Sequence, residues 1–323
     1  MLRWGVMGTG NIAHQFVNDA RHGSGGEFVG VYSRSQDRAD AFAKAFGLQH
    51  AFGDLDEFFA CDEIDVVYVA SPHTGHVEQA LALLEAGKAV LVEKPVAVSG
   101  RDAERLYRRS QELNLFCQEA FWTRFSPAYQ QILQQARDGR LGRLCHGQAN
   151  FGFQAPADLK HRLNNPDLAG GALLDIGLYP LLLTHDLFGE PSDIEGRVAL
   201  KNGVDRSADL VLRYEGGERS AVHYSLDYEL PQTAWISGEK GWVEIQSLWF
   251  APNCAHWKIG EAPVQVEHYP LLGQGYHYEF TATNNAIAAG RLDCAEHTHA
   301  DSLTLMRLLD RIRAKWGPRY PFE

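Results

Sequence analysis

The chain has 323 residues, of which 45% are hydrophobic and 22% are charged, and this composition excludes a disordered or fibrous protein. A chain of this length is expected to form two domains. Acidic residues outnumber basic ones by 41 to 30, which gives a formal net charge of -11. We therefore expect no broad basic surface and no nucleic acid partner.

Nothing in the sequence indicates export or insertion into a membrane. The first residues, MLRWGVMGTG, lack the basic head and long apolar stretch of a secretory signal. No later window shows the run of about 20 apolar residues that a membrane helix needs. The five cysteines are widely spaced and include no CxxC pair, which favours reduced, buried thiols over disulfides or a metal site. These features predict a cytoplasmic protein without a membrane partner or a bound metal.

Up to about residue 120, short apolar runs alternate with amphipathic segments, as in a parallel sheet with crossover helices. The expected strands are Leu2–Met7, Phe28–Ser33, Val66–Ala70, Ala89–Val92 and Leu115–Gln118. Helices are expected over residues 37–46 and 77–86, each ending at a glycine, and a third begins at Ser99 with Asp102 as a weak capping box. The pattern predicts an α/β, doubly wound domain over residues 1–119.

The second predicted domain covers residues 120–323 and starts with a helix near 127–137. Apolar residues then recur at every second position on both sides of a turn at 215–218, which predicts an antiparallel hairpin covered on one face. The residues of that face are Ala208, Leu210, Leu212, Tyr214, Val222, Tyr224, Leu226 and Tyr228. A turn at 238–241 adds two more strands. Helices near 179–188, 280–289 and 302–315 either pack on this sheet or return to the first domain.

A dinucleotide motif follows the first predicted strand and opens a helix: Gly8-Thr9-Gly10-Asn11-Ile12-Ala13, which matches GxGxxA. The first glycine permits a tight turn, and the second lets a pyrophosphate approach the backbone at the helix N-terminus. The alternative is a glycine-rich turn without a ligand, which the context of strand and helix disfavours.

The end of the second strand indicates which dinucleotide is bound. It lacks the Asp or Glu that holds the ribose of NAD and instead carries Ser33 and Arg34. Arg34 can pair with a 2'-phosphate and stack on adenine, and Arg38 lies one helical turn later. We therefore expect NADP(H), with NAD less favoured. The alternative is a solvated arginine at a strand end.

The third long strand ends in a polar segment at the edge where open α/β sheets bind ligands. Its residues are Ser71, Pro72, His73 and His76. The two histidines could contact the ribose or the nicotinamide; equally, His76 could only cap its helix.

Three residues could act together on a substrate hydroxyl. Lys94, in Glu93-Lys94-Pro95, ends a strand at the same edge, and the proline restricts its conformation. Asp175 and Tyr179 are four residues apart, so they can project from one helix face. A carboxylate and a phenol beside a lysine could position a hydroxyl and move its proton, because a nearby cation favours the phenolate. The alternatives are a surface lysine, a helix cap and a core tyrosine.

These motifs, with EAFWTRF at 119–125, GGALLDIGLY at 170–179 and SGEKGWVE at 237–244, resemble the glucose-fructose oxidoreductase, inositol dehydrogenase and rhizopine-catabolism (Gfo/Idh/MocA) family. The likeness is strongest to the branch of dimeric dihydrodiol dehydrogenases and D-xylose:NADP dehydrogenases. The resemblance implies an N-terminal Rossmann domain, a C-terminal α+β domain with an open, mostly antiparallel sheet, and NADP between them. It also implies a homodimer or higher oligomer that pairs through this sheet.

The resemblance further implies roles for individual residues. Lys94 would contact substrate and nicotinamide ribose, Tyr179 would donate and accept the proton, and Asp175 would orient the substrate. Neighbours of the cofactor or the substrate would be Trp122, Arg124, Phe125, Phe151 and Arg162. His73 departs from the family pattern, since relatives often carry Asn or Gln there.

The sequence thus predicts an NADP-dependent oxidoreductase that transfers hydride between nicotinamide and an aldose or a cyclic vicinal diol. Two other classes remain open. A glycoside-cleaving enzyme on this scaffold would keep its nicotinamide and release sugar without net reduction. A dinucleotide-binding regulator without catalysis is disfavoured by the presence of Lys94, Asp175 and Tyr179.

Overall fold

The computed structural model describes all residues from 1 to 323, and they form two compact units. The first consists of Met1–Phe125 and Leu272–Leu303, and the second of Ser126–Leu271 and Thr304–Glu323. This division differs from the expected boundary after residue 119, because 120–125 and 272–303 pack with the first unit. The last helix, α9 (His299–Trp316), contributes residues to both units.

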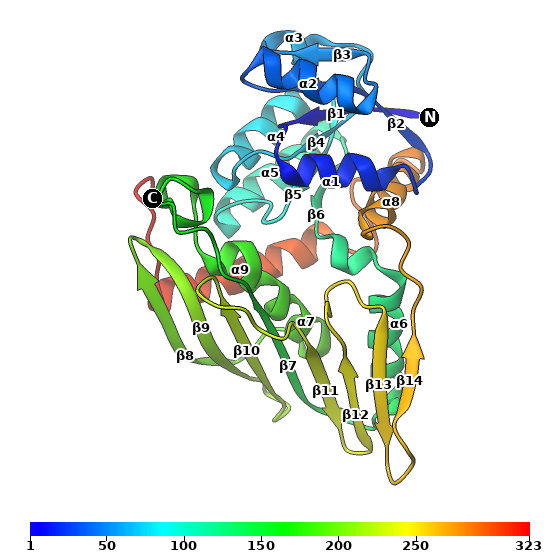
Figure 1. Cartoon of the computed structure of the whole chain (residues 1–323), viewed down its shortest axis with the longest axis vertical. Coiled ribbons are helices and arrows are strands. Elements are labelled where there is room, and N and C mark those ends of the chain that lie inside the picture. The colour runs from blue at the N-terminus through cyan, green and yellow to red at the C-terminus, as the bar shows by residue number, and fades with distance from the viewer. The chain divides into compact units, whose positions relative to one another are not determined.

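The first unit contains a six-stranded parallel sheet with the order β3-β2-β1-β4-β5-β6 and its connecting helices (Figure 1), which confirms the doubly wound α/β prediction. The strands are β1 (Leu2–Met7), β2 (Gly26–Tyr32), β3 (His50–Phe52), β4 (Val66–Val69), β5 (Ala89–Glu93) and β6 (Cys117–Ala120). The helices are α1 (Asn11–Ala20), α2 (Gln36–Phe46), α3 (Leu55–Ala60), α4 (His76–Glu85), α5 (Gly100–Leu113) and α8 (Tyr276–Ala288).

The predicted cap at Ser99 is present. The Asp102 backbone N–H donates to Ser99 Oγ at 3.2 Å, and the Ser99 hydroxyl donates to Asp102 Oδ2 at 2.7 Å. This satisfies one of the backbone N–H groups that a helix start leaves without an internal partner. The Ser99 side-chain cap therefore fixes where α5 begins.

An aromatic cluster explains why α8 belongs to the first unit. The Phe280 ring lies 4.9 Å from the Trp4 ring and 5.6 Å from the Phe28 ring. The Trp4 indole N–H also donates to Asn284 Oδ1 at 2.9 Å. Large aromatic side chains bury much apolar surface, so this contact holds α8 against β1 and β2. Of the two expectations for this helix, a return to the first domain is the one found.

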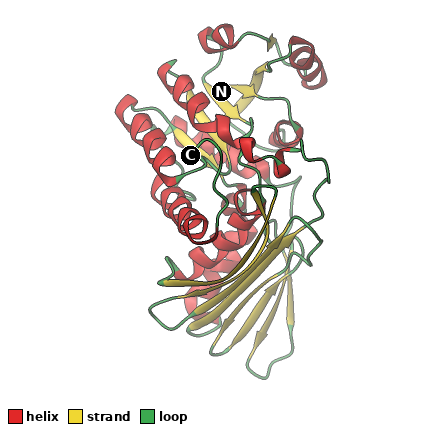
Figure 2. Ribbon diagram, turned by 90° about the vertical axis from the view of Figure 1, so that its left-hand side faces the viewer, coloured by secondary structure: helices red, strands yellow, loops and turns green.

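The second unit contains an eight-stranded sheet with the order β14-β13-β12-β11-β7-β10-β9-β8. The strands are β7 (Leu144–Gly152), β8 (Asp193–Lys201), β9 (Val204–Arg213), β10 (Arg219–Ser225), β11 (Ala234–Gly238), β12 (Gly241–Ile245), β13 (Cys254–Ile259) and β14 (Gln265–His268). Its helices include α6 (Pro127–Gln135) and α7 (Leu178–Phe188). Every neighbouring pair except β7 and β10 is antiparallel, and helices cover one face only (Figure 2), which confirms the open, mostly antiparallel sheet.

The predicted hairpin is formed by β9 and β10, where Leu210 pairs with Val222 and Ala208 with Tyr224. The alternating apolar residues of both strands are buried, as expected. Tyr228 was expected on the same face but is 45% exposed, because β10 ends at Ser225 and the alternation stops there.

One segment differs from the expectation that no long apolar run occurs. Residues Pro166–Phe188 are apolar and long enough to cross a membrane by length and composition, with a mean hydropathy of 1.3. However, 89% of the most apolar window is buried inside the protein. A core helix passes the same test of length and composition, so this segment serves as the core of the second unit.

The cysteines are all free thiols. Cys117 and Cys294 are buried, as expected, and burial raises the pKa of the Cys294 thiol to about 12. Cys61, Cys145 and Cys254 are only half-buried, which corrects the expectation for these three.

Candidate functional site

The carboxyl ends of β1, β2, β4 and β5 meet at one edge of the first sheet, and each is followed by a predicted site residue. Gly8 follows β1 with a φ of 112°, and a Cβ there would lie 2.7 Å from the Ala70 carbonyl oxygen. A Cβ on Gly10 would meet nothing within 4 Å. The first glycine is thus required by the turn, and the second leaves open space at the start of α1.

This open space suits a pyrophosphate. Gly10 is the N-cap of α1, and no side chain caps the helix, so the first backbone N–H groups can reach an anion. The Thr9 hydroxyl oxygen is buried and has no hydrogen-bond partner in the protein. An uncapped helix start beside an unsatisfied hydroxyl fits the phosphates of a dinucleotide.

The end of β2 places Ser33, Arg34 and Arg38 beside this turn. Ser33 is buried, and its Oγ accepts the Ser35 backbone N–H at 3.4 Å. Both arginines are exposed, and Arg38 Nη2 donates to the Thr9 carbonyl at 3.4 Å. At least one guanidinium therefore lies next to the glycine turn.

His76 has a structural position. It is the first residue of α4 and has no exposed surface, and its ring nitrogens lie 2.8 Å from the Pro95 and Ser71 carbonyl oxygens. Burial lowers the pKa of His76, although both carbonyls oppose this shift. We place the His76 ring beneath the loops that follow β4 and β5, and its contact with the cofactor stays a prediction. His73 is also buried, with its ring 5.7 Å from that of His76.

The backbone at Lys94 is held by its neighbour. The Glu93 carboxylate accepts the Lys94 N–H at 3.2 Å and the Tyr68 hydroxyl. Tyr68 is fully buried and stacks on Phe16 at 3.9 Å; burial and the Glu93 charge raise the pKa of its hydroxyl, so it stays a donor. Lys94 itself is half-buried. Sequence reasoning missed Tyr68, which looks like any apolar strand residue.

A second buried acid lies near this group. Neither oxygen of the Glu279 carboxyl group has a hydrogen-bond partner, and burial followed by the charges of Glu93 and Asp19 raises the pKa of Glu279 well above its usual value. Burial therefore favours the protonated form of Glu279. No sequence pattern pointed to it.

The segment Trp122–Phe125 forms a 3-10 turn after β6, and its residues are buried. The Trp122 ring lies 4.7 Å from that of Tyr276. Arg124 Nη1 lies 3.1 Å from His297 Nδ1 and 3.2 Å from Asp301 Oδ2. Arg124, predicted as a pocket residue, thus takes part in a buried ionic network.

Glu119 anchors this network. Its Oε2 lies 2.8 Å from His297 Nε2 and accepts the Ser302 hydroxyl at 2.5 Å, while its Oε1 accepts the Val96 N–H at 2.9 Å. Burial opposes ionisation, but these partners hold the pKa of Glu119 below its usual value. The carboxylate therefore stays charged and fixes the chain just after Lys94-Pro95.

In the second unit, Asp175 and Tyr179 lie on one continuous helical segment. It begins as a π-helix over Leu173–Gly177 and continues as α7. Both residues are only 5% exposed. Arg162 Nη1 donates to Asp175 Oδ1 at 2.9 Å, and the Arg162 side chain is 49% exposed. Arg162, predicted as a neighbour of the cofactor, is thus the ionic partner of Asp175.

Two aromatic side chains surround Tyr179. The rings of Phe151 and Phe250 stack at 4.4 Å, and the Tyr179 ring lies 5.4 Å from each. Phe151 was predicted and Phe250 was not, since it follows β12 in an irregular segment without periodicity. An apolar wall beside a phenol and an ion-paired carboxylate can hold a ring that carries hydroxyl groups.

Two family models match the chain. One is described as "Oxidoreductase family, NAD-binding Rossmann fold" and matches residues 2–121. The other is described as "GFO/IDH/MocA C-terminal domain" and matches residues 129–244.

Similar proteins cover the whole chain. The mouse (Mus musculus) trans-1,2-dihydrobenzene-1,2-diol dehydrogenase is 32% identical, over 99% of this chain and 98% of that protein. The scyllo-inositol 2-dehydrogenase (NADP(+)) IolU of Bacillus subtilis (strain 168) is 29% identical, over 100% of this chain and 99% of that protein. Among solved structures, the 3-ketoreductase KijD10 of Actinomadura kijaniata in complex with NADP and TDP-benzene superposes with a TM-score of 0.87 at 25% identity, over 98% of each chain.

Proposed function

The chain belongs to the GFO/IDH/MocA family of oxidoreductases, and we propose that it uses NADP(H) to transfer hydride to or from a hydroxyl-bearing carbon of a cyclic vicinal diol or a sugar. The observation that carries this proposal is the buried Asp175, ion-paired to Arg162, on the same helical segment as Tyr179. Relatives named for a cyclic dihydrodiol and for scyllo-inositol support this class of substrate.

In the proposed reaction, the residues of this chain manage the proton and the charge on oxygen. Tyr179 takes the hydroxyl proton as the carbonyl forms and returns it in the reverse direction. The Lys94 ammonium stabilises the developing alkoxide, and Asp175 orients the substrate by accepting a neighbouring hydroxyl. A bound nicotinamide would supply the hydride chemistry at the same carbon, and the glycine turn with Ser33 and Arg34 would hold its dinucleotide.

A ligand screen tests the proposal. Thermal shifts should be larger with NADPH than with NADH at equal concentration, because a ligand that binds only the native state raises the Tm. The absorbance of reduced nicotinamide should then change with a trans-dihydrodiol, with scyllo-inositol or with an aldose. Binding of NADPH without turnover of any cyclic diol or aldose would contradict the proposal.

The preference for NADP(H) is expected to depend on Arg34. In Arg34→Ala the Kd for NADPH should rise by about tenfold to a hundredfold, since a hydrogen bond to a charged group contributes about 1.5–3 kcal/mol. The Kd for NADH should rise much less, because NADH loses only the stacking on adenine. Arg101→Ala, which removes an exposed arginine of α5, is the control. Fluorescence titration measures both Kd values. An equal loss of affinity for NADPH and NADH would argue against a contact between Arg34 and the 2'-phosphate.

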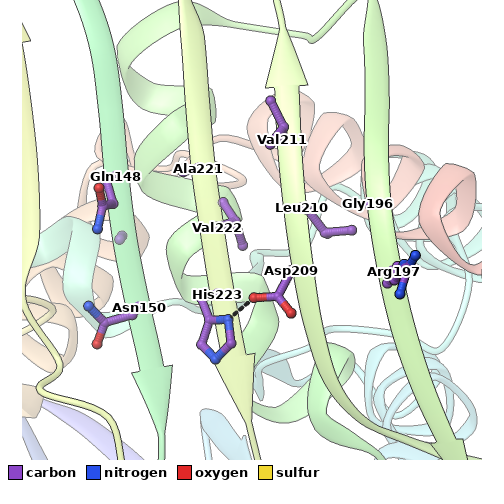
Figure 3. A pocket seen from close by; sticks show the side chains of 11 residues that line it. Gln148, Asn150, Gly196, Arg197, Asp209, Leu210, Val211, Ala221, Val222 and His223 are labelled. Atoms are coloured by element: carbon purple, nitrogen blue, oxygen red, sulfur yellow. Dashed lines mark hydrogen bonds and ion pairs between the residues drawn. The ribbon is translucent and has the colours of Figure 1, made fainter.

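We also propose that two chains pair through the uncovered face of the second sheet. A cavity of about 400 Å³ opens on this face. Figure 3 shows the side chains that line it, among them Gln148, Asn150, Arg197, Asp209, Val211 and His223. The cavity forms over Gly196, where a Cβ would clash with the Asp209 carbonyl oxygen. Val211 and Val266 are exposed, and the Trp235 and Trp242 rings pack together at 4.8 Å. These apolar side chains are spread among polar ones over a sheet face that no helix covers, and a second chain could bury them.

The pairing proposal predicts the mass of the particle in solution. Light scattering should give about twice the mass of one chain for the wild type, and Val211→Asp should shift it to the mass of one chain, because a carboxylate would be buried without a partner. Leu272→Asp, at an exposed leucine of the first unit, should leave the mass unchanged. A monomeric wild type would overturn the proposal.

A further inference from the structure

Asp205 is a buried carboxylate that none of the preceding roles uses. It lies near the start of β9, in a β-bulge. Asp205 pairs with Leu200 of β8, and Ser207 pairs with Ala199. Arg206, between them, has no partner on β8. A bulge of this kind inserts one extra residue into the strand, so that a neighbouring side chain points to the other face of the sheet. Asp205 has no exposed surface, whereas Asp209 on the regular part of the same strand points to the open face.

The Asp205 side chain reaches the start of the helical segment that carries Asp175 and Tyr179. Its Oδ2 accepts the Leu173 backbone N–H at 2.7 Å. Its Oδ1 has no hydrogen-bond partner in the protein. Because Leu173 opens the π-helix that contains Asp175, this bond fixes the first turn of that segment.

The segment before this turn is adapted to the carboxylate. Gly171 has a φ of 124°, and a Cβ there would lie only 2.2 Å from Asp205 Oδ1. The preceding Gly170 carbonyl accepts the Tyr320 hydroxyl at 2.9 Å. The paired glycines therefore let the chain pass close to Asp205 before the helix begins.

From these contacts we infer that Asp205 is a positioning residue, which sets the position of Asp175 and Tyr179 by binding the N-terminus of their helical segment. The inference rests on the proposed function, since it assumes that Tyr179 transfers the proton. A charged oxygen is well placed for this task, because the start of a helix carries a partial positive charge.

The charge on Asp205 changes near neutral pH. Burial raises the pKa of Asp205 to about 7, and the Leu173 and Ala172 N–H groups and Arg313 only partly oppose this shift. The titratable groups that face it are Tyr224 of β10, Arg313 of α9 and Tyr320 of the C-terminal segment. Arg313 also pairs with Asp310 and Glu323, and Asp175 on the helical segment pairs with Arg162.

The shift also predicts a change in stability. The pKa of Asp205 is higher in the folded chain than in the unfolded chain, so the protonated acid favours folding. This stabilisation is complete below about pH 4 and is lost as the pH rises through 7. The ionised carboxylate therefore reduces stability while it holds the helix start. A purely structural acid with the same raised pKa would show the same dependence of stability on pH, so only activity and hydrogen exchange distinguish the two roles.

Two substitutions separate these possibilities. In Asp205→Ala, kcat should fall by about tenfold to a hundredfold with little change in the KM for NADPH, as expected when reacting groups are misplaced by about 1 Å. In Asp205→Asn, which keeps a neutral acceptor for the Leu173 N–H, kcat should recover to the level of the wild type with a protonated Asp205, and the inflection near pH 7 should be lost. This variant should also have a higher Tm than the wild type, by a larger margin at pH 8 than at pH 5.

The measurements are pH profiles of kcat, thermal unfolding at both pH values, and hydrogen exchange of the peptide that covers residues 170–179. Asp227→Asn, which breaks the ion pair with Arg206 but does not touch the helix start, is the matched control. Unchanged exchange and an unchanged pH profile in Asp205→Asn would overturn the inference and leave the proposed function intact. If Tyr179→Phe were fully active instead, the proposed function would fail, whatever the behaviour of Asp205.

Discussion

Replacement of Tyr179 by Phe should lower kcat by about a hundredfold or more, which is the usual scale of general acid-base assistance. The ring would keep its packing against Phe151 and Phe250, so the change removes only the hydroxyl. The Kd for NADPH should stay nearly constant, because the dinucleotide turn lies in the other unit. Steady-state kinetics and fluorescence titration measure the two quantities separately.

Tyr269→Phe provides the control for the loss of a tyrosine hydroxyl. Tyr269 belongs to the same unit, and its hydroxyl donates to Glu267 at 2.7 Å. This variant should retain wild-type kcat even if it is somewhat less stable. Full turnover in Tyr179→Phe would remove this phenol from the mechanism.

Replacement of Lys94 by Ala should lower kcat by about 10²–10³-fold, the range observed when one group that stabilises an oxyanion is lost. The Glu93 carboxylate accepts the Lys94 backbone N–H, and this bond does not involve the Lys94 side chain. The loop should therefore keep its conformation after the substitution. Thermal unfolding should accordingly change little. Single-turnover rates with saturating NADPH isolate the chemical step from binding.

Lys94→Arg distinguishes charge from geometry. The guanidinium keeps a positive charge, but it is planar and longer than an ammonium, so only part of the rate should return. A fully active Lys94→Ala, or a defect confined to the Kd for NADPH, would show that the ammonium does not act on the substrate oxygen.

The first unit could be predicted well because its signals are local. A glycine turn between a strand and a helix depends only on neighbouring residues, and so do periodic apolar runs. These signals placed β1, β4 and β5 correctly. The short β3 and α3 were missed, since three and six residues carry too little periodicity. The place of α8 was left open because it depends on the contact of Phe280 with Trp4, far apart in the chain.

The candidate site was predicted less completely. The sequence indicated Lys94, Asp175 and Tyr179 through motifs, but not the residues that support them. Tyr68 and Glu279 resemble ordinary core and helix residues until folding brings them near Glu93. Asp205 was hidden by a bulge, which shifts the alternation of a strand without leaving a mark in the sequence.

The most direct test is a double-mutant cycle of Lys94→Ala and Tyr179→Phe, measured as single-turnover rates of nicotinamide oxidation with a substrate found in the screen. When two groups act together on one carbon, removing the second causes little further loss of rate once the first is gone. We expect the double variant to be about as slow as the slower single variant. A rate lowered by the product of the two separate losses would mean that the lysine and the phenol act independently, and would contradict the proposed chemistry.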